Sequence, residues 1–400
     1  MATLGPAALV ASLIALGLAE RRARDLARRA VPLRIHVNGT RGKSTVTRLL
    51  AGALRAGGIR CLAKTTGTEP RLILPDGSER AIRRRAPASI REQLWAMRQA
   101  RALGARAVVL ECMAVEPELQ AVAERDMIRA TIGVITNARL DHAEAMGATV
   151  EDVAAALALT IPERGTIVVG PTGGADVIAA AARAKGARLV VAAAESAPPG
   201  PDVNPGPDAG LGTHPDLGPE AGSRPDWCAD NAGIALAVTR LLGIPDDVAR
   251  SGMREAAPDP GAAQRGAVDA AGRRVEYLDA SAANDPESLD RLLTPRTGQA
   301  LFVFNHRMDR PLRLRQFAEA EPWSRDTDRL VVTGDRPDWL TWRRLRRRLP
   351  GGRLAFERPS RLAARLAADL RADAGATLLV FCGNTKGFGR EPLLAALRRR

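Results

Sequence analysis

The chain has 400 residues, of which 46% are hydrophobic, and its 59 basic residues outnumber its 45 acidic ones to give a formal net charge of +14. This length and apolar content indicate a globular, enzyme-sized chain of two or three domains. Five Trp, six Phe and one Tyr, with no basic stretch interleaved with stacking residues, argue against nucleic-acid binding, and four scattered cysteines exclude a Cys-based metal cluster and indicate reduced thiols.

The first 29 residues predict a membrane anchor. Residues 2–19 carry no charge and are mostly apolar, and Glu20 is followed by a run of arginines. Because the positive charge follows the apolar run, we expect a single N-terminal anchor at the cell membrane with the catalytic domains on the cytoplasmic side. The many alanines and Pro6 leave open a buried or amphipathic helix instead.

A phosphate-binding loop is predicted after the first strand. Residues 33–37 alternate as a short apolar strand, residues 38–45 read NGTRGKST, and residues 46–56 are helical. Glycines allow backbone N–H groups to surround an anion, the ammonium group of Lys43 can reach the terminal phosphates, and the hydroxyl of Ser44 can hold Mg²⁺. The spacing G-x-x-G-K-S, which begins at Gly39, is shorter than in the usual P-loop. Its place between a strand and a helix nevertheless predicts nucleotide binding.

Two further strand ends carry polar groups. Glu111 follows the buried strand 106–110, where a second carboxylate can bind the Mg²⁺ of the nucleotide. The strand 131–136 is followed by Asn137 and then by Asp141 and His142. Because parallel strands place ligands beyond their carboxyl ends, we expect these groups to share one active edge with Lys43.

The remaining pattern predicts two α/β domains. Predicted strands at 59–63, 166–170 and 188–192, a hairpin over 71–82, and helices at 89–103, 150–159 and 175–184 complete a mainly parallel sheet. Residues 196–226 are rich in Pro, Gly and Asp and are predicted to be a flexible insertion. A helix begins at Asp230-Asn231. Strands at 275–278, 300–304, 329–333 and 377–381 alternate with helices at 287–293, 311–318, 339–345 and 361–370, and an arginine-rich helix ends the chain.

These motifs, in this order, resemble the Mur ligase superfamily. Within it, the segments NGTRGKSTVTRLL, KTTGT, ECMAVEP, DNAGIALAV, PDPGA and AAND resemble the catalytic subunits of poly-γ-glutamate synthases. The resemblance runs from the N-terminal segment to the last helix. It implies a P-loop-containing Mur ligase-like central domain over 30–265, behind the anchor at 1–29, and a smaller, Rossmann-like α/β domain over 266–400.

The resemblance also implies ATP-dependent amide ligation through an acyl phosphate. ATP and Mg²⁺ would be required, glutamate would be joined to acidic poly-γ-glutamate, and small membrane subunits would be partners. Lys43, Glu111 and His142 would be catalytic, with Ser44, Glu111 and His142 holding Mg²⁺. The implied ATP-binding residues are Gly39, Thr40, Arg41, Gly42, Lys43, Ser44, Thr45, Asn231 and Arg265. The implied substrate contacts are Asn284, Asp285, Arg307, Asp309 and Arg310, for each of which a surface ion pair or a helix cap is the alternative.

Two departures from the superfamily matter. The P-loop begins near residue 38, with no preceding UDP-sugar domain in this sequence, so a UDP-muramoyl substrate is not expected. No lysine lies between Lys64 and Lys185 to serve as the carbamylated lysine of many relatives, so a second metal would need other ligands. A folylpolyglutamate synthase-like ligase and a P-loop ATPase that drives a membrane complex without ligation remain the alternative functions.

Overall fold

The computed structural model divides into two compact units, one ending at Asp259 and the other running from Pro260 to Arg400. The described residues are 4–67, 70–84, 88–194, 226–257, 259, 263–270, 272–281, 285–293, 298–323, 327–372, 376–384 and 390–398. Almost all of the predicted insertion at 196–226 and the candidate Asn284 lie outside them.

The first unit is built on an eight-stranded sheet with the order β4-β3-β2-β5-β1-β6-β7-β8. Its strands are β1 Leu33–Asn38, β2 Cys61–Lys64, β3 Arg71–Ile73, β4 Glu79–Ala81, β5 Ala107–Glu111, β6 Ile132–Ile135, β7 Thr166–Val169 and β8 Arg188–Val191. All neighbouring strands are parallel except β2 with β3 and β3 with β4. The phosphate-loop strand β1 is therefore central, with β5 and β6 on its two sides.

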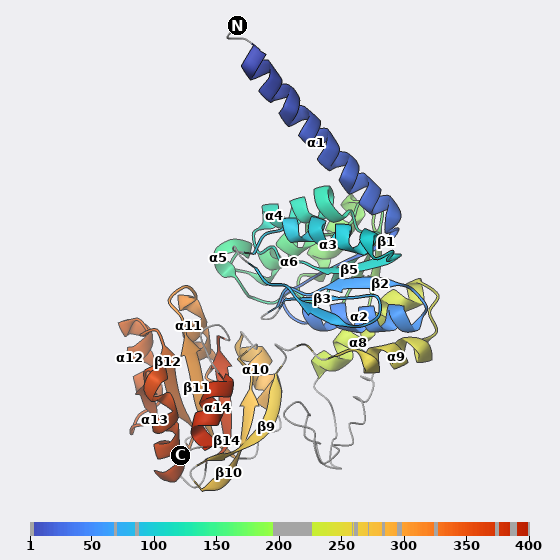
Figure 1. Ribbon diagram of the computed structural model, residues 1–400. Helices are drawn as coiled ribbons and strands as arrows, with labels where there is room; N and C mark the ends of the chain where they lie inside the picture. Colours follow the sequence, from blue (N-terminus) through green and yellow to red (C-terminus); the bar gives the residue numbers. More distant parts are fainter. Residues whose placement is uncertain are drawn as a thin grey trace. The chain divides into compact units, whose positions relative to one another are not determined.

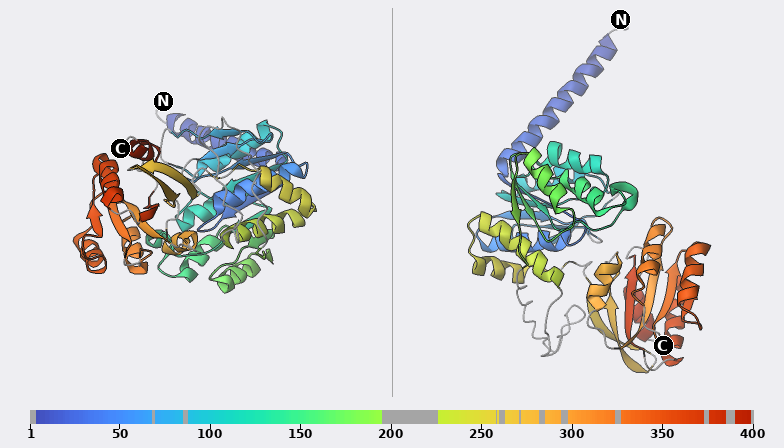
Figure 2. Two further views of the ribbon diagram at one scale, coloured as in Figure 1. Left: turned by 90° about the horizontal axis from the view of Figure 1, so that it is seen from below. Right: turned by 180° about the vertical axis from the view of Figure 1, so that it is seen from behind.

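Helices cover both faces of this sheet (Figure 1; Figure 2, right). One face packs against α2 Lys43–Ala56, α8 Asp226–Leu241 and α9 Asp246–Glu255. The other packs against the end of α1 Leu4–Ala30, α3 Arg91–Ala102, the π-helix η1 Ala123–Ile128, α6 Val150–Ala158 and α7 Ala175–Ala184. The short helices α4 Pro117–Val122 and α5 Ala143–Met146 complete the unit. Neighbouring residues of β1 face opposite layers, since Ile35 and Val37 contact one core whereas His36 points to the other side.

The prediction of a membrane anchor is wrong. None of the helices in the described part of the chain combines the length and apolar composition that a membrane crossing requires. In α1, the uncharged residues 4–19 make about 24 Å of helix against a hydrocarbon core of about 30 Å, and Glu20 and Arg21 follow in the same helix. The last turns of α1 pack onto the first unit instead, where Ala27 is buried and Arg28 donates to the carbonyls of Asp126 and Met127.

Helices α2 and α9 cross at two glycines. A Cβ atom added to Gly252 would lie 2.3 Å from the carbonyl oxygen of Gly52, and one added to Gly52 would lie 2.2 Å from that of Gly252. The close crossing therefore depends on the absence of both side chains. This contact holds α9 against the helix that follows the phosphate loop.

We expect Gly252→Ala to lower the free energy of unfolding by about 1–3 kcal/mol, because the helices must separate to admit a methyl group. Urea unfolding followed by circular dichroism measures the change. Gly17→Ala is the matched control: an added Cβ at Gly17 meets nothing within 4 Å, so it should leave stability unchanged or slightly higher. Equal effects of the two substitutions would contradict the packing argument.

The second unit is a smaller α/β layer structure. Its six-stranded sheet has the order β13-β12-β11-β14-β10-β9 and is parallel except for β9 with β10. The strands are β9 Gln264–Ala270, β10 Arg273–Asp279, β11 Gln299–His306, β12 Arg329–Gly334, β13 Leu354–Phe356 and β14 Ala376–Gly383. On one face lie α10 Pro286–Leu293, α11 Pro311–Ala320 and α12 Trp339–Arg348, and on the other α13 Pro359–Ala372 and α14 Arg390–Arg398. The predicted fold class is confirmed.

Candidate active site

The loop between β1 and α2 has the conformation that the glycine pattern predicts. Gly39 has φ +133° and Gly42 has φ +80°, both in the region that favours glycine. A Cβ at Gly39 would lie 2.0 Å from Thr136 Oγ1, and one at Gly42 would lie 2.4 Å from Asn231 Oδ1. Any side chain at either position would therefore collide with the groups that surround the loop.

The end of β6 holds this loop in place. The N–H of Thr40 donates to the carbonyl of Asn137 at 2.9 Å, and the N–H of Arg41 donates to Asn137 Oδ1 at 3.0 Å. Asn137 Nδ2 in turn donates to the carbonyl of Arg41 at 3.1 Å. Asn137, which the sequence analysis placed at the end of this strand, thus fixes the backbone of the phosphate loop through hydrogen bonds.

Lys43 and the first turn of α2 form the anion-binding part of the loop. Lys43 Nζ folds back over the loop and donates to the carbonyls of Gly39 and Thr40 at 2.5 and 3.4 Å. Gly42 caps α2 without a side-chain bond, so the first N–H groups of the helix, including that of the half-buried Thr45, have no cap. An ammonium group beside open helix N–H groups suits the terminal phosphates of a nucleotide.

The predicted pair of metal ligands is in direct contact. Ser44 Oγ donates to Glu111 Oε2 at 2.8 Å, and the N–H of Thr66 donates to the same oxygen at 2.7 Å. Both side chains are buried, with Glu111 only 3% exposed. A hydroxyl and a carboxylate are hard oxygen donors of the kind that Mg²⁺ takes together with phosphate and water oxygens, so these residues fit the ion.

A buried lysine that received no role in the sequence analysis lies close to Glu111. Lys64, at the end of β2, is completely buried, and its Nζ lies 3.4 Å from Glu92 Oε2 and 3.7 Å from Met113 Sδ. Burial lowers the pKa of Lys64, against the opposing effect of the carboxylates of Glu92 and Glu111. The rarity of lysine in this arginine-rich chain was the only signal in the sequence for such a position.

His142 lies in a different arrangement from Ser44 and Glu111. It has a positive φ of 51°, its Nε2 is 3.8 Å from Asp141 Oδ2, and its Nδ1 is 3.7 Å from Glu144 Oε1. Asp141 also pairs with Arg41 of the phosphate loop at 3.2 Å. Among the described residues no group of three His, Cys, Asp or Glu side chains could hold a metal ion. The role of His142 as a metal ligand therefore stays a prediction.

Asn231 and Asp259 approach the same loop from distant parts of the chain. Asn231 is buried on α8, and its amide packs against Gly42, beside the phosphate loop. A Cβ at Gly67 would lie 3.0 Å from Ser44 Oγ and 3.8 Å from Asp259 Oδ2. Asp259, in the PDPGA segment, thus places a further carboxylate near Ser44, a position that the sequence analysis did not assign.

The candidate residues of the second unit have local roles in the structure. Arg265, on β9, donates through Nη2 to the carbonyl of Leu292 at 2.6 Å. Asp285 accepts from the N–H of Ser288 at 2.8 Å and from its hydroxyl at 2.7 Å, as a helix cap does at the start of α10. Asp285 therefore has the role of a helix cap, which was the alternative to a substrate contact in the sequence analysis.

The other candidates of the second unit follow β11. Arg307 pairs with Asp309, and the backbone N–H of Arg310 donates to the carbonyl of Arg307 at 3.0 Å before α11 begins. Nothing in these contacts tests whether they meet a substrate, so their roles, like that of Arg265, stay predictions.

A buried ion pair joins β1, the strand before the phosphate loop, to the π-helix η1. His36, in β1, is fully buried, and its Nδ1 lies 2.8 Å from Glu124 Oε2 of η1. Burial alone would lower the pKa of His36, but Cys112 and Glu124 outweigh it and raise the pKa to about 9. The imidazole is therefore protonated at neutral pH. This pair could not be predicted from the sequence, since 88 residues separate its members.

His36 predicts a pH dependence of stability. Because its pKa rises from 6.5 in the unfolded chain to about 9 in the folded one, its contribution is complete below pH 6.5 and is lost as the pH rises through 9. We expect wild type to lose on the order of 3 kcal/mol more of its free energy of unfolding than His36→Gln between pH 6 and pH 10. Urea unfolding at several pH values measures this difference, and parallel pH profiles would contradict the ion pair.

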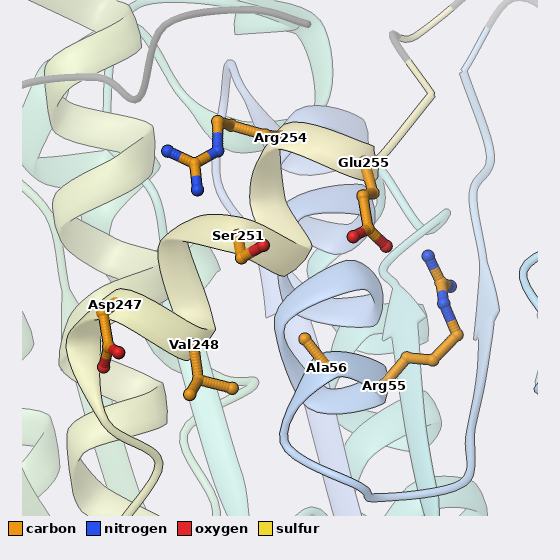
Figure 3. A pocket seen from close by; sticks show the side chains of 7 residues that line it. All are labelled: Arg55, Ala56, Asp247, Val248, Ser251, Arg254 and Glu255. Carbon is orange, nitrogen blue, oxygen red and sulfur yellow. The ribbon is translucent and has the colours of Figure 1, made fainter.

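A hollow of about 640 Å³ lies away from the phosphate loop. Residues of α2 and α9 line it, and Figure 3 shows their side chains. The α2 residues that line it, Arg55 and Ala56, end the 14-residue helix that Lys43 begins. Because such a helix is about 20 Å long, the hollow is separate from the candidate active site.

The fold belongs to a known class of enzymes. Residues 37–193 match the Mur ligase middle domain. Among solved structures, MurF from Acinetobacter baumannii aligns at 13% identity with a TM-score of 0.67, covering 97% of this chain and 80% of that one. A Mycobacterium tuberculosis folylpolyglutamate synthase complexed with ADP aligns at 18% identity with a TM-score of 0.61, covering 96% of this chain and 94% of that one. The fold is that of the Mur ligases.

The sequence comparisons are more specific. Residues 266–400 match the poly-gamma-glutamate synthase CapB C-terminal domain. The PGA synthase CapB of Bacillus subtilis is 31% identical over 335 residues, which cover 81% of this chain and 80% of that protein. The capsule biosynthesis protein CapB of Bacillus anthracis is 33% identical over 321 residues, covering 76% of this chain and 64% of that protein. The chain belongs to the CapB family of poly-γ-glutamate synthases and is a ligase.

Proposed function

We propose that the chain is an ATP-dependent amide ligase that joins glutamate to a growing poly-γ-glutamate chain. ATP transfers its γ-phosphoryl group to a γ-carboxylate and leaves as ADP. The amine of the second glutamyl partner then attacks the acyl phosphate, so that a C–N bond forms, a C–O bond breaks, and phosphate and a proton are released. The contact between Ser44 and Glu111 beside Lys43 supports this proposal, because it joins a phosphate loop to a carboxylate of the kind that binds Mg²⁺.

Each residue of the site has a chemical part in this proposal. Lys43 neutralises charge on the transferring phosphoryl group, and the N–H groups at the start of α2 hold the phosphate oxygens. Ser44 and Glu111 would hold Mg²⁺, which would supply positive charge to the phosphate oxygens of the nucleotide. Asn231 and Arg265 remain candidates for contacts to the nucleotide. The candidate second-unit contacts to the glutamyl substrate are Asn284, Asp285, Arg307, Asp309 and Arg310.

The substrate and partners come from the family. PGA in the name of the Bacillus subtilis relative supports glutamate and acidic poly-γ-glutamate as the substrates. Small membrane subunits of a polymer-synthesising and exporting complex are proposed partners on the same basis. The folylpolyglutamate synthases among the structural neighbours are under 25% identical and support the fold only, so we favour the polymer ligase.

The test is phosphate release from ATP and Mg²⁺, with and without glutamate, combined with mass spectrometry of the products. We expect release that depends on glutamate and yields γ-linked oligomers. Release without any amino-acid requirement would point instead to a P-loop ATPase that drives another complex. Release that depends on a folate, with glutamate added to it, would identify the folylpolyglutamate synthase alternative.

A further inference from the structure

A basic surface on the second unit has no part in the site described above. Helix α12 contains five arginines and no acidic residue within ten positions. Arg343 lies over the ring of Trp339 at 5.8 Å, Arg346 over Trp342 at 6.0 Å, and Arg336, just before the helix, over Phe356 at 5.6 Å. We name these three arginines and three aromatic residues the arginine–aromatic face.

The members of this face form one continuous surface. Trp339 and Arg343 are four residues apart, as are Trp342 and Arg346, and the two pairs are offset by three residues, so they lie side by side on the helix. The rings of Trp342 and Phe356 meet edge to face at 6.5 Å, which joins α12 to β13. β13 is an edge strand of the second sheet, so this surface lies at the rim of the unit.

The aromatic residues make the face rigid and leave its charges available. Trp342 and Phe356 are half-buried against the core of the second unit and serve as fixed platforms. Arg336, Arg343 and Arg346 are exposed, and over the described part of the chain none of them has a carboxylate within ion-pair distance. A guanidinium stacked on a ring keeps its N–H edge free to donate to a carboxylate in bidentate geometry.

The charged residues around the arginine–aromatic face are held in contacts of their own. Asp338 caps α12 by accepting from the N–H of Thr341 at 2.9 Å, and Asp335 accepts from the N–H of Met308 at 2.8 Å. The other arginines of the helix include Arg344, which pairs with Glu319 at 2.6 Å. Arg348 likewise pairs with Glu321, so two of the five arginines of α12 are held in ion pairs, in contrast to the stacked Arg343 and Arg346.

We propose that the arginine–aromatic face binds the acidic polymer, a chain of γ-linked glutamyl residues with a free carboxylate on each unit. This inference rests on the proposed function. Three preorganised guanidinium groups along one face match a ligand whose carboxylates repeat, and they give individually weak contacts that add along the chain. A nucleic acid is the poorer match, because the arginines cover the ring faces on which bases would stack.

Binding of a fluorescent γ-glutamate oligomer of defined length to the full chain tests the proposal by anisotropy. The triple variant R336Q/R343Q/R346Q is expected to raise the Kd about tenfold and to weaken its dependence on salt. The matched control R315Q/R344Q/R348Q removes the same charge from arginines that already pair with Glu319 or Glu321, and it should change the Kd less than about twofold. Equal losses in the two triple variants, or none in either, would overturn the proposal.

Two companion measurements separate the remaining outcomes. Single-stranded DNA of equal length and vesicles of phosphatidylglycerol are titrated in parallel. Tighter binding of either one, lost in R336Q/R343Q/R346Q, would overturn the polymer as the ligand. Glutamate-dependent phosphate release by wild type without added polymer tests the proposed function separately. If wild type releases phosphate and the two triple variants bind polymer equally, only the inference about this face fails.

Discussion

Lys43→Met is expected to reduce glutamate-dependent phosphate release by about 10³-fold or more and to leave the fold intact. Among the described residues, the hydrogen bonds of Lys43 Nζ go to the carbonyl groups of Gly39 and Thr40 in its own loop, so its loss removes charge from the site but little from the core. The transferring phosphoryl group loses a compact cation that no other lysine of this site can replace, because the buried Lys64 faces Glu92. Steady-state kinetics and thermal unfolding measure the two effects.

Two substitutions serve as controls for Lys43→Met. Lys43→Arg keeps the charge but places a planar guanidinium group in a loop that fits a compact ammonium group. We therefore expect this variant to retain only a small part of the wild-type activity. Lys185 donates to three carbonyls at the end of α6, at 2.8 to 3.2 Å, and lies outside the site. Lys185→Met should therefore lower stability while the folded enzyme keeps its turnover. Full turnover in Lys43→Met would remove the phosphate-loop assignment.

The sequence predicted the local parts of the site well. A strand, a glycine turn and a helix start are consecutive, so the conformation of residues 33–56 depends on neighbours in the chain. The helix begins at Lys43, three residues before the expected Val46, because a glycine with positive φ caps it. The strand ends also predicted that Ser44 and Glu111 share one edge of a parallel sheet, whereas their direct contact depends on the order of the strands.

Contacts that depend on sheet order or on unusual backbone were not predictable. The position of β5 beside β1, which sets Val37 opposite Glu111, comes from the crossover of the chain. The π-helix η1 and the antiparallel strand β9 carry no distinctive period in the sequence. Contrary to the sequence-based expectation, residues 339–348 do interleave two tryptophans with five arginines, and only the contribution of Phe356 depends on the folded unit. The anchor prediction failed because the charged residues from Glu20 onward, interpreted as the flank of a membrane span, continue the same helix as the apolar run.

Glu111→Gln is expected to raise the Mg²⁺ concentration needed for half-maximal nucleotide binding by about tenfold to a hundredfold, with a similar fall in turnover. The substitution keeps the size of the side chain and one oxygen that can accept from Ser44 and Thr66, so the loop should hold its shape. It removes the negative charge that attracts the ion. Calorimetric titration of a non-hydrolysable ATP analogue at several Mg²⁺ concentrations measures the binding effect independently of catalysis.

Glu116→Gln provides the matched control for Glu111→Gln, since Glu116 is exposed five residues further along and makes no side-chain cap of α4. It removes the same charge from the same segment, so any effect of overall electrostatics on the ion would appear in both variants. We expect only Glu111→Gln to shift the Mg²⁺ titration. An identical titration in wild type and Glu111→Gln would mean that the contact with Ser44 is structural. The carboxylate of Asp259, which approaches Ser44 from the end of the first unit, would then be the next residue to test as a ligand.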